Sequence, residues 1–164
     1  KSVISLEFKD IKKVQIEYPT VSEQSFSITN IGDWSYELRA LSRDSIVMNY
    51  DSTALKIYLT KFKNIQFEGF EENITKATKD SVFNSTPVNI LTCQGTDGNE
   101  VIMRSYLKPD YEDRVDMDGN PVIYDVDRMY AQINDTDELV TIQYYVFDEI
   151  FLGLGNFLKP KDKI

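Results

Sequence analysis

A regular alternation of apolar and polar side chains runs through the N-terminal part of the chain. Every second residue is apolar in three short runs, namely Ile4-Leu6-Phe8, Val14-Ile16-Tyr18 and Phe26-Ile28. Successive side chains of a strand point to opposite faces, so such a run buries one face and exposes the other. Pro19 ends the second run, because proline lacks the N–H that a sheet ladder needs. The pattern therefore predicts antiparallel strands that cover a core with one face only.

The single tryptophan, Trp34, stands directly after the turn-forming segment 30–33. Asparagine, glycine and aspartate in that segment favour a tight turn. An apolar-polar run then continues through residues 34–38. Because a large ring at the start of a strand is typical of a core residue, we expect Trp34 to be buried, with a ligand platform as the alternative interpretation.

Other segments carry helical periodicity. The clearest apolar stripe, at i, i+3, i+4 and i+7, consists of Leu55, Tyr58, Leu59 and Phe62. Asp51, or the serine after it, can cap the start of this helix. Residues 147–158 repeat the spacing and predict a final helix, although Gly153 and Gly155 weaken it. Residues 67–86 are less regular and indicate one or two short helical turns.

Two hairpins complete the expected fold. The first has arms over residues 87–93 and 100–107 around a glycine-containing loop, and the second spans residues 128–145. We expect an α+β fold, in which an antiparallel β-sheet built from hairpins carries two to three helices packed on one face. The length suits a single globular domain over residues 1–164.

The chain contains no histidine and one cysteine, Cys93. Histidine is the usual general base near neutral pH and the commonest metal ligand, so we expect a protein that is not an enzyme, with no catalytic residue and no cofactor. A lone cysteine cannot form an internal disulfide. Cys93 lies in an apolar-leaning run, where we expect it to be a buried small hydrophobic residue.

The net charge and the hydropathy of the chain limit the classes of partner that it can bind. With 27 acidic against 18 basic residues, the net charge is −9, which disfavours binding to nucleic-acid phosphates. No run approaches the ~20 apolar residues that span a bilayer. Because the chain begins at Lys1, we expect it to be the soluble part of a longer, N-terminally anchored protein that contacts a membrane only through that anchor.

Residues 108–121 form an acidic stretch without periodicity, and we expect an exposed loop there. Three aspartates precede a glycine in it, as in a calcium-binding loop: Asp113, Asp116 and Asp118. The spacing does not match a calcium-binding loop, however. With Gly119 at the glycine position of such a loop, Arg114 occupies the position of the first acidic ligand, and Asp125 occupies the position that requires a glutamate. No metal site is therefore predicted, and Asp116 and Asp118 remain a weak calcium candidate.

Tyrosine and phenylalanine concentrate in the C-terminal half, where exposed rings could stack on a sugar or on a partner protein. We expect a binding surface at the 108–121 loop with three anchors: Tyr111, Tyr124 and Tyr130. The neighbouring acids Asp113, Asp116 and Asp118 would orient the partner.

Three blocks of the sequence, residues 58–64, 124–131 and 139–148, resemble an uncharacterised family of membrane-anchored envelope proteins from Bacteroidetes. The resemblance implies an extracytoplasmic location, in the periplasm or anchored in the cell envelope. The resemblance does not identify any functional residue in this chain, because these blocks are hydrophobic and structural.

Taken together, the residues and the resemblance predict a non-enzymatic binding module of the bacterial envelope with a protein or glycan partner. A small-ligand or glycan-binding domain is the first alternative and requires a pocket lined by exposed rings. A carboxylate-based glycoside hydrolase is the less favoured second alternative, since it requires two facing acids, one with a raised pKa. A calcium-stabilised, adhesin-like module is the third.

Overall fold

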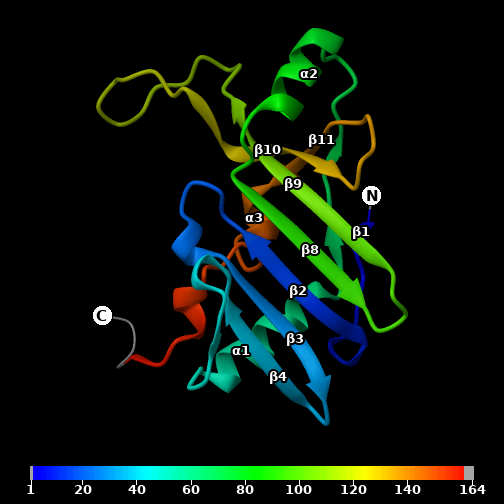
Figure 1. Ribbon diagram of the computed structural model, residues 1–164. Helices are drawn as coiled ribbons and strands as arrows, with labels where there is room; N and C mark the ends of the chain where they lie inside the picture. The colour runs from blue at the N-terminus through cyan, green and yellow to red at the C-terminus, as the bar shows by residue number, and fades with distance from the viewer. Residues whose placement is uncertain (1, 161–164) are drawn as a thin grey trace.

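The computed structural model describes residues 2–160 and places most strands in one large sheet (Figure 1). Nine strands follow the spatial order β5 (Ser45–Val47), β4 (Ser35–Ala40), β3 (Phe26–Gly32), β2 (Ile11–Glu17), β8 (Asn89–Gly95), β9 (Glu100–Pro109), β10 (Tyr124–Ile133), β11 (Val140–Gln143) and β7 (Gly69–Phe70). All neighbours in this sheet are antiparallel. A separate two-stranded sheet pairs β1 (Ser2–Ile4) with β6 (Ile65–Gln66). Both predicted hairpins are present, as β8–β9 and β10–β11.

Three α-helices accompany the sheets: α1 (Ser52–Leu59), α2 (Lys76–Asn84) and α3 (Tyr144–Phe147). Short 3₁₀ turns lie at Phe8–Asp10, Ser22–Gln24, Leu41–Arg43, Thr60–Phe62 and Leu154–Phe157. The carboxylate of Asp51 accepts a hydrogen bond from the Ala54 N–H at 3.0 Å, so Asp51 is the predicted cap of α1. The predicted α+β class, an antiparallel sheet with helices, is confirmed. Each helix found between residues 2 and 160 is too short or too polar to span a lipid bilayer.

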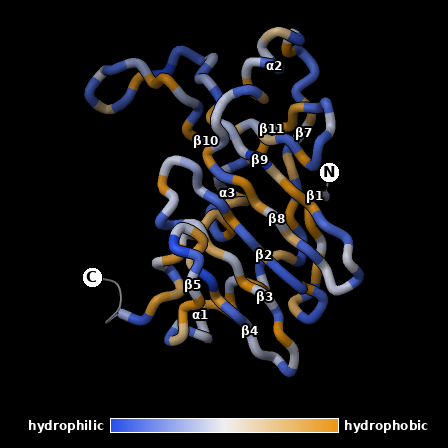
Figure 2. The backbone as a smooth tube through the Cα atoms, viewed as in Figure 1, coloured by the Kyte–Doolittle hydropathy of each residue, from blue (hydrophilic) through white to orange (hydrophobic). Residues whose placement is uncertain are grey.

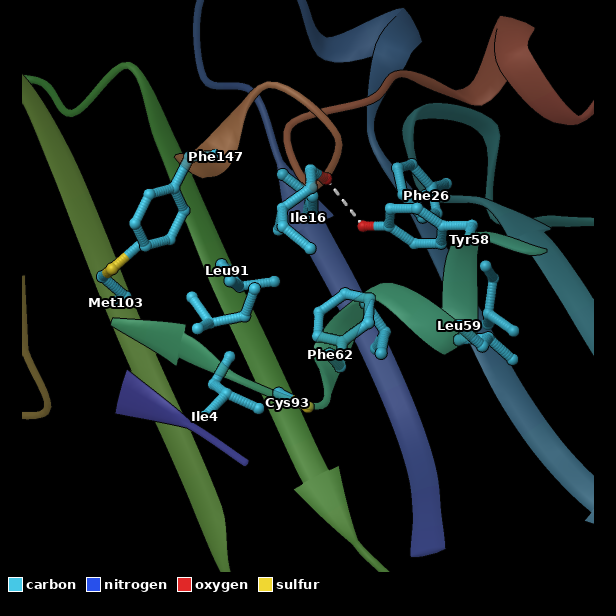
Figure 3. Packing of buried hydrophobic residues seen from close by; sticks show 14 of the residues in the cluster. Ile4, Ile16, Phe26, Tyr58, Leu59, Phe62, Leu91, Cys93, Met103 and Phe147 are labelled. Atoms are coloured by element: carbon cyan, nitrogen blue, oxygen red, sulfur yellow. Dashed lines mark hydrogen bonds between the residues drawn. The ribbon is translucent and has the colours of Figure 1, made fainter. Parts of the chain in front are cut away.

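One face of the sheet holds the main core (Figure 3). The apolar stripe of α1 and its 3₁₀ extension is fully buried against this face, as the spacing of Leu55, Tyr58, Leu59 and Phe62 predicts. Alternate residues of the sheet complete this core, among them Val14, Ile16, Phe26, Ile28, Leu38, Leu91 and Met103. The small β1–β6 sheet covers the same face, since its Ile4 and Ile65 belong to the same cluster.

Helix α2 packs against the opposite face at the β9–β10 end of the sheet. The register pairs Tyr106 with Tyr130 and Ser105 with Ala131, so both tyrosines point away from the core face that Ala131 joins. There they form a second buried cluster with Leu139, against which Ile74, Val82 and Phe83 pack. The rest of that face is mostly polar and half-exposed, with Ile90 and Ile102 among its apolar residues.

The final helix predicted over residues 147–158 is not continuous. Helix α3 ends at Phe147, and a 3₁₀ turn begins only at Leu154. Gly153 between them has an extended backbone, with φ −107° and ψ 168°. A Cβ at this position would collide with the end of the Gln24 side chain, so a larger residue would require that flexible side chain to shift.

The expectation that Trp34 is buried is wrong, because the ring is 64% exposed. Trp34 and Asp33 form the two-residue turn between β3 and β4, with φ values of 60° and 51°. Positive φ at both positions is the type I′ geometry that matches strand twist, and it is rare for a bulky aromatic residue. The turn lies at the tip of the hairpin, beyond the reach of the core.

Cys93 is buried, as its apolar neighbours predict. Burial raises the pKa of the Cys93 thiol to about 12. The thiol therefore stays protonated at neutral pH and fills space in the core as a small hydrophobic group.

Candidate interaction site on the β9–β10 arm

The segment between β9 and β10, residues 110–123, projects from the sheet as a hairpin-like arm (Figure 1). Of the stretch 108–121, expected as an exposed loop, the first two residues complete β9, and most of the others are exposed and lie outside the strands. Backbone hydrogen bonds join the N–H of Asp110 to the carbonyl of Ile123 (3.0 Å), Val122 to Arg114 (2.8 Å) and Asp116 to Asn120 (2.9 Å). Gly119, with φ 81°, closes the turn at the tip. The arm is therefore an ordered element.

Apolar and polar residues are interspersed along the arm and the start of β10 (Figure 2), and several of the apolar side chains are exposed. Six side chains are each at least 49% exposed: Tyr111, Val115, Met117, Ile123, Tyr124 and Val126. A single exposed apolar residue is normal on a protein surface, but a concentration of them in one projecting segment is typical of an interaction site. We call these six residues the arm set.

A charge cluster fixes the root of the arm. The guanidinium of Arg114 lies 3.0 Å from the Asp110 carboxylate, 3.3 Å from Asp125 and 3.2 Å from Asp127. The Asp110 side chain is only 1% exposed, and its second oxygen accepts the backbone N–H of Arg114 at 3.0 Å. Arginine suits this role because its planar fork donates to several carboxylates at once.

Asp125 connects this cluster to the sheet. Its carboxylate accepts the backbone N–H groups of Asp127 (2.8 Å) and Arg128 (3.0 Å), where the register between β9 and β10 shifts. Lys108 lies 3.5 Å from the same carboxylate. The Lys108 ammonium also sits 4.8 Å from the centre of the Tyr111 ring, within cation–π range, and so holds this exposed ring near the sheet.

The pKa values of Asp110 and Asp125 are both lowered in the folded protein. Burial by itself would raise the pKa of each carboxyl, but hydrogen bonding and positive charge outweigh burial. For Asp110 the opposing groups are the backbone and side chain of Arg114. For Asp125 they are the N–H groups of Asp127 and Arg128, followed by Lys108 and Arg114.

Acidification is therefore expected to loosen the arm before the sheet unfolds. A carboxyl with a lowered folded-state pKa stabilises the fold at pH values above its unfolded pKa of about 4, and this stabilisation is lost as pH falls through the folded value. We expect the Nε–H signal of Arg114, followed by NMR, to lose its bonded position as pH falls below about 4. In the Asp110→Ala variant, which removes the acceptor of the Arg114 Nε–H, this bonded position should be missing already at neutral pH. An Arg114 signal that stays unchanged until global unfolding would contradict the prediction.

The structure separates the three predicted tyrosine anchors. Tyr111 and Tyr124 are exposed at the arm, where they were expected. Tyr130 is only 1% exposed, so the expectation that its ring is a surface anchor is wrong. It faces Tyr106 across the strand pair, in the cluster that α2 covers. Burial raises the pKa of Tyr130, and the adjacent Tyr111 adds to the effect.

The predicted acids Asp113, Asp116 and Asp118 are exposed along the arm. One oxygen of Asp116 accepts the backbone N–H groups of Asp118 and Asn120, each at 2.9 Å, so this carboxylate closes the turn. Within residues 2–160, no group of three or more acidic or cysteine side chains is placed to hold a metal ion. The calcium candidate at Asp116 and Asp118 thus gains no additional ligand from the fold.

The sequence interpretation missed four members of the arm set: Val115, Met117, Ile123 and Val126. Their exposure could have been predicted from the sequence, because apolar residues within an acidic segment rich in turn-forming residues have no core close to them in the chain. Arg114 was considered only as the residue that breaks a calcium register. Its role as a clamp depends on Asp125 and Asp127, which the fold brings close to it.

Comparison of the chain with protein-family models, with curated proteins and with solved structures gives no match. The functional interpretation therefore depends on the geometry of this molecule and on the residues at its surface.

Proposed function

We propose that this protein is a binding module that docks a partner protein through the β9–β10 arm. The arm set carries this proposal: six exposed apolar side chains lie on or beside an element ordered by its own hydrogen bonds. The Arg114 cluster holds the root of the element in place. A preordered binding element loses less conformational entropy on association than a flexible loop, which favours affinity.

The charges around the arm set indicate the kind of partner. Glu112, Asp113 and Asp118 are exposed beside it, and the chain carries a net charge of −9. A complementary surface would present an apolar depression for Met117 and Val115 with lysine or arginine at its rim. Such a rim would speed association, and the acidic residues of the arm would repel acidic partner surfaces.

We further propose that the module is non-enzymatic and acts outside the cytoplasm, in a bacterial envelope. The resemblance of residues 58–64, 124–131 and 139–148 to an envelope family supports the location. The downward pKa shifts of Asp110 and Asp125 are opposite to the shift that a general acid in a carboxylate-based hydrolase requires. Protease accessibility of the tagged chain in intact cells and in cells with only the outer membrane permeabilised tests the location, and protection under both conditions would contradict it.

Site-specific crosslinking tests the docking proposal. A photo-crosslinking amino acid is placed at Met117 in the source cells, and at Met48 as a control, because Met48 is exposed but lies outside the arm. We expect a discrete partner band from position 117 only. With that partner purified, Met117→Asp should raise Kd by about tenfold or more, whereas Met48→Asp should leave it unchanged. Equal bands from both positions, or an unchanged Kd, would refute docking through the arm.

A further inference from the structure

A second exposed feature, distant in sequence from the arm, is Trp34 at the β3–β4 turn. Its ring is 64% exposed, and its backbone is in the left-handed region with φ 60°. Asparagine and glycine are the residues that usually occupy a turn of this type. Trp34 therefore has an unfavourable backbone conformation and an exposed apolar ring, and no burial in the core offsets the free-energy cost of either. Such combinations concentrate at functional sites.

The ring of Trp34 is held in a defined orientation. Phe8 stacks on it with ring centroids 5.6 Å apart and an angle of 11° between the planes. Phe8 in turn contacts the buried Tyr36 at 5.8 Å. One face of the indole is thus supported by the fold, and the ring forms a fixed aromatic platform.

A cavity of about 240 Å³ opens beside this platform and is lined by Trp34, Lys9, Asn30, Gly32 and Asp33. Phe8, which covers one face of the indole, is absent from its lining. The Asn30 carbonyl oxygen Oδ1 accepts the Gly32 N–H at 2.9 Å, which orients the amide and leaves its NH₂ group available. The Lys9 ammonium and the Asp33 carboxylate form no ion pair or hydrogen bond with other side chains of residues 2–160.

We propose that Trp34, Lys9, Asn30 and Asp33 form a subsite for a β-linked, gluco-configured pyranose. Equatorial hydroxyls leave such a sugar with flat C–H faces that can stack on an indole, while the hydroxyls radiate from its edge. Around the ring of Trp34 stand two donors, Lys9 and the Asn30 amide, and one acceptor, Asp33. One apolar platform with a few converging polar groups is typical of small-ligand recognition.

Tryptophan fluorescence tests the proposal directly, because Trp34 is the only tryptophan of the chain. Cellotetraose and chitotetraose are the probes. We expect a saturable change in emission with at least one of them, at concentrations up to about 10 mM. Lys9→Ala combined with Asp33→Gly should weaken binding by about fivefold or more, since two hydrogen-bonding groups are lost while glycine suits the positive φ of residue 33. Lys56→Ala, an exposed lysine of α1, is the matched control and should leave binding unchanged.

Calorimetry with Trp34→Gly is the second measurement, because glycine suits the left-handed turn and preserves the fold. We expect no detectable heat with the sugar that the native chain binds. The proposal is overturned by the absence of a response to both sugars, or by a response that the Lys9 and Asp33 substitutions leave unchanged. A blue shift on phosphatidylglycerol vesicles without a sugar response would also overturn it and indicate a membrane-inserting hairpin. Met117→Asp should not alter the response, so this test is independent of the arm.

Discussion

Replacing Tyr58 by alanine is expected to lower the free energy of unfolding by about 3–5 kcal/mol. Tyr58 is 2% exposed and contacts three further rings edge-on: Phe26, Phe62 and Phe157, with centroid distances of 5.9, 5.2 and 5.2 Å. Its hydroxyl donates to the carbonyl of Ile150 at 2.8 Å (Figure 3). The side chain therefore joins α1 to the sheet and to the C-terminal segment, and its loss leaves a cavity between all three.

Urea unfolding followed by far-UV circular dichroism measures this effect. Tyr58→Phe is the matched variant, since it keeps the ring and removes only the buried hydrogen bond, at a cost of about 1–2 kcal/mol. Tyr145→Ala is the surface control, because this ring is exposed, and it should change stability by less than about 0.5 kcal/mol. If Tyr58→Ala were no less stable than Tyr145→Ala, α1 would not pack as described.

The second large effect is expected at the arm, where Arg114→Gln should release the root while leaving the sheet folded. Glutamine has no positive charge to pair with the carboxylates of Asp110, Asp125 and Asp127. Asp110, whose side chain is 1% exposed, would be left without its cationic partner and would favour an open arm. We expect amide protection at Val122 and Asp116 to fall by at least about tenfold, because these hydrogen bonds belong to the arm itself.

Hydrogen exchange measured by mass spectrometry tests this expectation at neutral pH. Lys76→Gln is the control, because Lys76 also pairs with an aspartate, Asp80 at 2.6 Å, but on the exposed surface of α2. Exchange in β2 and β8 should be unchanged in both variants. If the arm amides were equally protected from exchange in Arg114→Gln and in the native chain, the Arg114 cluster would not be what orders the arm.

This variant also bears on the proposed function, since it leaves every member of the arm set in place. If affinity depends on a preordered arm, Arg114→Gln should weaken partner binding without removing a single contacting apolar side chain. Met117→Asp, in contrast, should weaken binding while arm protection stays native. The two variants thus separate the order of the arm from its contact surface.

Local periodicity in the sequence was sufficient to predict most of the regular structure. Alternation at Val14 and Ile16 or at Phe26 and Ile28 places them on the core face of their strands, and helical spacing places Leu55 on the buried side of α1. The cap at Asp51 and the burial of Cys93 could also be predicted, because both depend on neighbours in the chain. In each case, the residues that decide the outcome lie within one or two turns or along one strand.

Residues whose environment is set by distant segments could not be placed in this way. Tyr130 is covered because the β9 register brings Tyr106 beside it and α2 packs on both. Trp34 is exposed because its turn projects beyond the core, although its sequence context is typical of a buried ring. The arm is ordered because Asp125 and Asp127 of β10 meet Arg114 across the hairpin. The period of the side chains was thus enough to predict β2, β3, α1 and their core face, but not the first apolar run, where β1 ends at Ile4 and a 3₁₀ turn begins at Phe8. Which aromatic rings reach the surface is instead a property of the folded chain, because exposure depends on which distant segment packs over each ring.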